Sequence, residues 1–151
     1  MTKWHLITDG SCLGNPGKGG WAFILTNEEI ETIKSGYEET TTNNRMELQA
    51  LISGLKLFAS KYDNPLTVTM DSQYILNGIK SWMANWKKNN WKTSAKTAVK
   101  NQDLWQELDK TMNNMKLSFN WTRGHNGHIL HDRVDVIARC AATQHARCQC
   151  A

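Results

Sequence analysis

The sequence has no apolar run that approaches the roughly 20 residues needed to cross a bilayer. Its first residues, MTKWHLITDG, contain no apolar signal core and no small-residue cleavage site. Among 151 residues there are only two prolines, and we find no internal repeat, low-complexity tract or linker. These absences argue against membrane, secreted and multidomain classes. They predict a single cytoplasmic domain over residues 1–151.

The chain has no C-x₂-C pair of cysteines; its four cysteines are Cys12 near the start and Cys140, Cys148 and Cys150 near the end. Without a secretory signal, reduced thiols are the default expectation. The spacing of the last three cysteines and His145 matches no C-x₂-C zinc pattern. We therefore expect a divergent tail over about 143–151 rather than a metal knuckle.

One segment lacks acidic residues altogether. Between Asp71 and Asp103 there is no Asp or Glu, although the formal net charge of the whole chain is only +4. The same segment contains six lysines: Lys80, Lys87, Lys88, Lys92, Lys96 and Lys100. Such a local basic patch on a nearly balanced body predicts a polyanionic partner that binds one face.

Hydrophobic periodicity predicts alternating strands and helices. The strands are expected at 3–9, 20–26, 31–37 and 116–123, and a turn followed by a strand is expected over 64–71. Helices are expected at 44–62, in short pieces through Trp86, at 103–115 and at 132–142. The order β-β-β-α-β-α-α-β-α indicates an α/β fold, a mixed sheet with helices on its faces.

Two predicted strands end in a carboxylate, Asp9 and Asp71. Ligands of open α/β sheets gather beyond the carboxyl ends of parallel strands. If these two strands are parallel neighbours, the two acids lie side by side. A glycine-rich turn, GSCLGNPGKGG, follows Asp9. It is not a P-loop, because Gly19 follows Lys18 where Ser or Thr is required.

Two further acids, Glu47 and Asp135, begin predicted helices that can face the same sheet edge. Each has a purely structural alternative. With Asn44 as the N-cap of its helix, Glu47 would complete a capping box. With Asp132 as the N-cap of the last helix, Asp135 would have the same role, favoured by the helix dipole. Four carboxylates that converge without a basic partner would repel one another, so protons or cations must neutralise them. Mg²⁺ takes oxygen ligands of this kind and often shares them with substrate phosphate. A metal ion on Asp9 would therefore turn a phosphate-repelling group into a phosphate-binding one, and the glycine-rich turn beside it would contact neighbouring sugar and backbone atoms.

Several blocks together resemble bacterial type 1 ribonuclease H. These are TDGSCLGNPGKGG, TTNNRMELQAL, DSQYI, NWKKNNWKT, VKNQDLW and RGHNGH…DRVDVIARCAA, spread over about residues 5–142. The resemblance implies the ribonuclease H-like fold, a five-stranded mixed sheet with helices on both faces. It also implies an endonuclease that cuts the RNA strand of an RNA–DNA hybrid and leaves 5′-phosphate and 3′-hydroxyl ends.

The resemblance implies a site in which Asp9, Glu47, Asp71 and Asp135 hold two Mg²⁺ ions, or Mn²⁺, with Asp9 between them. His125 matches a mobile histidine that assists proton transfer or product release. We expect His128 and His131 to be surface residues. Asp132 adds a carboxylate that either alters metal binding or, as we favour, caps the last helix.

The resemblance also assigns contacts to the hybrid. Asn15 and Thr42 match a pocket for a DNA-strand phosphate, and the 2′-hydroxyl distinguishes RNA. The remaining matched positions are Gly10, Ser11, Cys12, Asn43, Asn44 and Gln73. In the basic segment, Trp82 and Trp86 are expected on one helix face, mainly as packing anchors, with Trp82, Lys87, Lys88 and Lys92 meeting the substrate.

Two other functions remain open from the residues alone. An integrase or junction resolvase would use the same carboxylate–metal chemistry on DNA, and a binding module would keep the surface with a dead site. The DGSCLGNPG and NNRMEL blocks argue against the first, and the presence of all four acids argues against the second. No obligate protein partner is indicated, so we expect a monomer.

Overall fold

The computed structural model describes residues 3–14, 16–27, 29–92, 99–122 and 129–144. Its sheet has the strand order β3-β2-β1-β4-β5. The strands are β1 (Trp4–Cys12), β2 (Gly17–Thr26), β3 (Glu31–Thr41), β4 (Leu66–Met70) and β5 (Leu117–Trp121). β1 pairs antiparallel with β2 and parallel with β4, so the sheet is mixed, as predicted.

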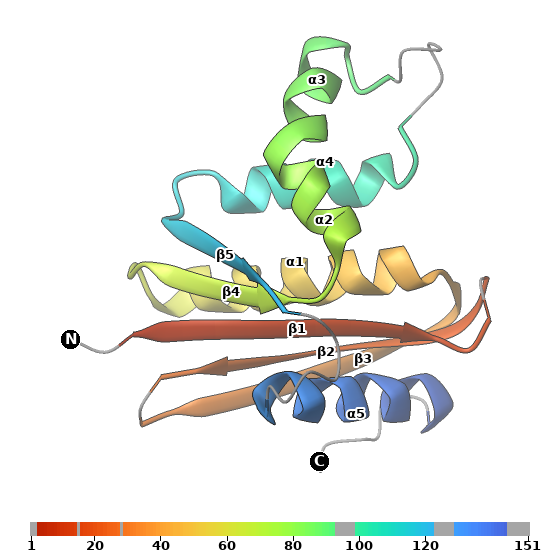
Figure 1. Ribbon diagram of the computed structural model, residues 1–151, viewed down its shortest axis with the longest axis vertical. Coiled ribbons are helices and arrows are strands. Elements are labelled where there is room, and N and C mark those ends of the chain that lie inside the picture. Colours follow the sequence, from red (N-terminus) through yellow and green to blue (C-terminus); the bar gives the residue numbers. More distant parts are fainter. Residues whose placement is uncertain (1–2, 15, 28, 93–98, 123–128, 145–151) are drawn as a thin grey trace.

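Helices cover both faces of this sheet (Figure 1). They are α1 (Asn43–Lys61), α2 (Gln73–Asn77), α3 (Met83–Lys88), α4 (Gln102–Met112) and α5 (Ile129–Gln144), with a π-helical turn η1 (Gly78–Trp82) between α2 and α3. The element order agrees with the sequence prediction. Within the described ranges, no helix is long and apolar enough to cross a membrane.

Alternation along the strands divides the core into two parts. Leu6, Phe23 and Leu25 belong to the larger cluster, with α1 and α4. Ile7 and Ile24 point the other way and pack on α5. Asp9 has the same parity as Ile7 along β1, so it lies on the α5 side of the sheet.

The first three strands are longer than predicted. β1 continues past Asp9 to Cys12, because its pairing with β2 runs through Cys12 opposite Gly19. Much of the glycine-rich stretch is therefore strand, and Asp9 lies within β1 rather than at its end. A shift of register between Gly17 and Gly19 interrupts the pairing of β2 with β3.

Two close approaches bring the helices onto the sheet. A Cβ at Gly10 would lie 2.5 Å from the backbone nitrogen of Glu47, so only glycine lets β1 pass this close to α1. A Cβ at Gly20 would lie 2.4 Å from the carbonyl oxygen of Ala138, which applies the same restriction to α5 on β2.

Candidate active site

The parallel pairing of β1 and β4 sets Asp9 beside Asp71. Its register matches Trp4 with Leu66 and ends at Ile7 with Thr69. Asp9 and Asp71 lie two residues beyond this last matched pair, where the two strands part. Asp71 is held in place because the indole Nε1 of Trp121 donates to its carbonyl oxygen at 3.0 Å.

Glu47 enters the site from α1. The N-cap of α1 is Thr42, whose hydroxyl accepts from the backbone N–H of Arg45, so the predicted capping by Asn44 is wrong. Glu47 lies in the second turn, where it is not part of a capping box. Its Oε1 instead accepts a hydrogen bond from the backbone N–H of Gly10, which ties the start of α1 to β1 beside Asp9.

Asp135 enters from α5 on the opposite face. Helix α5 begins at Ile129, three residues before the predicted start, so Asp132 lies in the first turn and is not the N-cap. Asp135 is therefore in the second turn, where first-turn dipole stabilisation does not explain it. Its carboxylate pairs with Arg139, one turn further along α5. The predicted lack of a basic partner for the acids is thus wrong at Asp135.

His131 was expected on the surface but is buried, with only 2% of its area exposed. It lies four residues before Asp135, on the same side of α5. Its Nε2 is 3.8 Å from Oδ2 of Asp71. Ligand atoms of Asp9, Asp71 and His131 all lie within 4.8 Å of one another. The sequence contained no signal for this burial, because His131 follows two other histidines in a polar stretch and its burial depends on where α5 begins.

The electrostatics reflect crowding of like charge. Asp9 and Glu47 are each only 4% exposed. Burial raises the pKa of Asp9 to about 8; a hydrogen bond with Glu47 opposes this rise, and Asp135 and Asp71 add to it. Burial likewise raises the pKa of Glu47 well above its usual value, and the charge of Asp9 raises it further.

This donor set fits a hard divalent cation. Four carboxylates from β1, α1, the end of β4 and α5 meet around Asp9, which interacts with each of the other three. Two of the carboxylates are buried where ionisation without a counter-charge is costly. A divalent ion supplies such a counter-charge and prefers oxygen ligands.

Comparison with known proteins agrees with this geometry. The RNase H family profile matches residues 1–143. The Ribonuclease H of Hydrogenovibrio crunogenus (strain DSM 25203 / XCL-2) is 52% identical over 141 residues, which are 93% of this chain and 96% of that protein. The chain belongs to the ribonuclease H family.

Other members give the same result. The Ribonuclease H of Pseudomonas putida (strain W619) is 51% identical over 134 residues, 89% of each chain. The crystal structure of LC9-RNase H1, a type 1 RNase H with the type 2 active-site motif, has a TM-score of 0.85 at 29% identity and covers 95% of this chain and 73% of that one. As a ribonuclease H, the chain is a metal-dependent nuclease that cuts the RNA strand of RNA–DNA hybrids.

Several of the residues predicted to contact the hybrid lie close in the chain to the acids. Gly10, Ser11 and Cys12 form the end of β1, and Thr42, Asn43 and Asn44 form the start of α1. Gln73 is exposed in the first turn of α2, directly after Asp71 and the N-cap Ser72. Asn15 and His125 lie outside the described residues.

The basic segment projects from the ribonuclease H body as α2, η1 and α3 (green in Figure 1); we call α2–α3 and the turn after it, residues 73–92, the handle. Trp86 packs edge-on against the buried Trp105 of α4, with ring centroids 5.3 Å apart. The ring centroids of Trp82 and Trp86 are 5.9 Å apart, which confirms that the two rings lie on the same helix face. Trp82 is 37% exposed, so part of its ring remains open to solvent.

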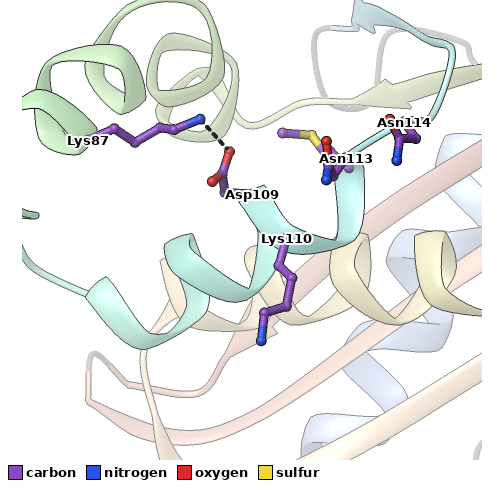
Figure 2. Close-up of a pocket in the computed structure, with 6 residues that line it drawn as sticks. Lys87, Asp109, Lys110, Asn113 and Asn114 are labelled. Atoms are coloured by element: carbon purple, nitrogen blue, oxygen red, sulfur yellow. Dashed lines mark hydrogen bonds and ion pairs between the residues drawn. The ribbon is translucent and has the colours of Figure 1, made fainter.

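The handle lysines differ in their surroundings. Lys88 and Lys92 are exposed. Lys87 instead reaches across to Asp109 of α4, with Nζ 3.2 Å from Oδ1, as Figure 2 shows. The pocket in Figure 2 lies between α3 and the end of α4, and none of the four acids lines it.

A polar network joins the handle to the start of α1. Arg45 forms a two-pronged ion pair with Asp103 at the start of α4, at 3.0 and 2.8 Å. It also donates to Asn101, whose amide donates in turn to the hydroxyl of Tyr74 in α2. Arg45 lies two residues before Glu47 in α1, so this network fixes the handle relative to the acids.

Proposed function

We propose that Asp9, Glu47, Asp71 and Asp135 hold two Mg²⁺ ions, with Mn²⁺ as an alternative, and that hybrid cleavage takes place on them. The observation that carries the proposal is the position of Asp9, which interacts with Glu47, Asp71 and Asp135 at once. Asp9 is therefore the residue that would help hold both ions. Ions bound there would supply an activated water and stabilise the leaving 3′ oxygen.

The protein's own groups have separate tasks in this proposal. The N–H of Gly10 orients Glu47, and the indole of Trp121 fixes the backbone at Asp71. Asp135, whose carboxylate pairs with Arg139, would help hold the ion that activates water. His125 is assigned to proton transfer or product release. Cleavage in this way would leave 5′-phosphate and 3′-hydroxyl ends.

Recognition of the hybrid is proposed for the surface around the acids. Gly10, Ser11 and Cys12 offer backbone groups to the RNA strand, and Asn43, Asn44 and Gln73 offer neutral donors and acceptors. Asn15 and Thr42 take a DNA-strand phosphate. Trp82, Lys87, Lys88 and Lys92 meet the hybrid further along through the handle, where each phosphate contact releases counterions.

An Asp9→Asn variant tests the proposal. We expect it to bind hybrid but to lose cleavage at any practical Mg²⁺ concentration, because an amide cannot bridge two cations as a carboxylate does. Labelled RNA–DNA hybrid, duplex DNA and duplex RNA are incubated with each protein and Mg²⁺, then with a chelator. Asp63→Asn, an exposed acid after α1, is the matched control.

Substantial cleavage by Asp9→Asn would contradict the assignment of the site. Cutting of duplex DNA in preference to hybrid would favour the resolvase or integrase alternative, and binding without cutting by the wild type would favour the binding module. The cytoplasmic location and the monomeric state stay predictions, to be checked by fractionation and by sedimentation.

A further inference from the structure

His131 is the buried group that the four-carboxylate description leaves out. It is 2% exposed, and it comes from α5, one helical turn before Asp135. Its Nε2 faces Oδ2 of Asp71 at 3.8 Å. A buried imidazole whose ring nitrogen lies close to two carboxylates can act on whatever those carboxylates bind.

The distances suit a shared cation. For ion–ligand bonds of about 2.1 Å, adjacent ligand atoms lie about 3.0 Å apart and opposite ones about 4.2 Å. The 3.8 Å separation of His131 and Asp71 falls between these values. The third residue is Asp9, which offers a carboxylate oxygen within 4.8 Å of the ligand atoms of both His131 and Asp71. Small side-chain adjustments bring all three onto one ion.

We propose that His131 is a metal ligand of this site, adding an imidazole nitrogen to the carboxylate oxygens of Asp9 and Asp71. The inference rests on the proposed function only in taking this cluster as the place where the catalytic ion binds. It extends the set of four acids by a residue that is not a carboxylate.

A nitrogen ligand changes which ions the site prefers. Mg²⁺ favours oxygen donors, whereas imidazole suits Zn²⁺, Co²⁺ and other transition ions. His131 therefore raises the affinity for transition ions relative to Mg²⁺, with Mn²⁺ between the two classes. An alternative assigns His131 as a protonated cation that pairs with Asp71 and never touches a metal. The two assignments make opposite predictions when the histidine is replaced.

Electron spin-echo spectroscopy of the Mn²⁺-loaded protein tests the ligand directly. We expect ¹⁴N modulation from a bound imidazole in the wild type, and its loss in His131→Asn. His5→Asn, at the opposite end of β1, and His125→Ala are the matched controls and should keep the modulation. Absence of the modulation in the wild type, its survival in His131→Asn, or its loss in His125→Ala would each overturn the proposal.

Calorimetric titration of the metal-free proteins gives a second readout. His131→Asn should lower the affinity for Co²⁺ and Zn²⁺ by about tenfold or more, while that for Mg²⁺ changes much less. A His131→Gln variant repeats the measurement if Asn disturbs folding, which circular dichroism checks. Equal losses for all ions, or tighter binding of all ions, would favour the charge-pair alternative and overturn the ligand assignment.

These results are separable from the proposed function. Wild-type protein that shows the nitrogen signal but does not cut hybrid would refute the nuclease assignment and leave the ligand assignment standing. Wild-type protein that cuts hybrid without the nitrogen signal would do the reverse.

Discussion

Asp9 is the residue most affected by its surroundings, because it is buried and meets three other carboxylates. Its pKa of about 8 means that the folded, metal-free protein binds a proton there more tightly than the unfolded chain does. Folding stability therefore falls as pH rises from about 4, the ordinary value, to about 8. At neutral pH the negative charge of these carboxylates is tolerated only when protons or cations neutralise it.

Replacing Asp9 by Asn should remove the part of this pH dependence that Asp9 contributes, while buried Glu47, whose pKa is also raised, keeps a smaller part. In a chelator, we expect the variant to be more stable than the wild type at pH 8, with the difference disappearing near pH 4. A single group contributes a slope of up to about 1.4 kcal/mol per pH unit in that window. Urea unfolding at a series of pH values measures it. Asp63→Asn should track the wild type throughout, and a constant difference between Asp9→Asn and wild type would contradict the electrostatic account.

Gly10 has a steric rather than an electrostatic part in the site. A Cβ there would meet backbone atoms of Met46 and Glu47 at 2.6 and 2.5 Å, and backbone cannot rotate away. We expect Gly10→Ala to cost about 1–3 kcal/mol in unfolding free energy and to weaken metal binding, because Glu47 loses its hydrogen bond with the Gly10 N–H. Gly14→Ala, whose Cβ first meets Pro16 at 3.1 Å in an exposed turn, should cost less. Denaturation and calorimetry compare the two variants.

Among the elements, the handle combines an apolar anchor with exposed charge. Trp86 fixes it on Trp105 of α4, while Lys88 and Lys92 remain exposed. The pairing of Lys87 with Asp109 was not visible in the sequence, because it joins residues on α3 and α4 that only the fold brings together.

Replacing Lys88 and Lys92 together by Gln should raise KM for hybrid and leave kcat little changed. The slope of log KM against log salt concentration should fall by about one to two, because fewer phosphate contacts release fewer counterions. Lys87→Gln should have a smaller effect, because its charge is already partly offset by Asp109. Steady-state assays over a range of salt concentrations test this, with Lys61→Gln at the end of α1 as control. An unchanged salt slope in the double variant would count against the handle as a binding element.

The order of elements was predictable because each has a clear hydrophobic period, and so was the meeting of Asp9 and Asp71 at neighbouring parallel strands. Helix starts were predicted less well. Thr42, not Asn44, caps α1, and both are residue types that cap helices well. At α5, Asp132 was the obvious cap, yet the helix begins at Ile129. That error moved His131 from the helix to a loop and hid its burial.

The sequence also gave no reason to pair the cysteines. Reduced thiols were the default expectation, whereas Cys140 in α5 is disulfide-bonded in the structure. Cys12 is free, so the partner of Cys140 lies outside the described residues.

For the molecule as a whole, the two faces of the sheet are unequally covered. The α1 face has a large core that includes α4 and the handle anchor, while α5 rests on a few side chains: Ile7, Ala22, Ile24, Val134, Ile137 and Ala138. We expect α5 to open locally at lower free energy than α1.

Native-state hydrogen exchange in chelator should show faster exchange for amides of α5 than of α1. Added Mg²⁺ or Mn²⁺ should slow exchange in α5, by up to about 100-fold at 100 times the dissociation constant, because the ion joins Asp135 on α5 to Asp9 on β1. Asp9→Asn should abolish this protection. Protection of α1 alone would contradict a site shared across both faces.

The position of α5 in the chain has a consequence for synthesis. Asp9, Glu47 and Asp71 leave the ribosome early, but Asp135 is added only when α5 is made, and α5 can dock on β2 only after it has cleared the exit tunnel. A nascent chain stalled before that point contains three of the four acids on a sheet with one bare face. Nuclease activity should therefore appear abruptly, with the last helix, and not grow with chain length.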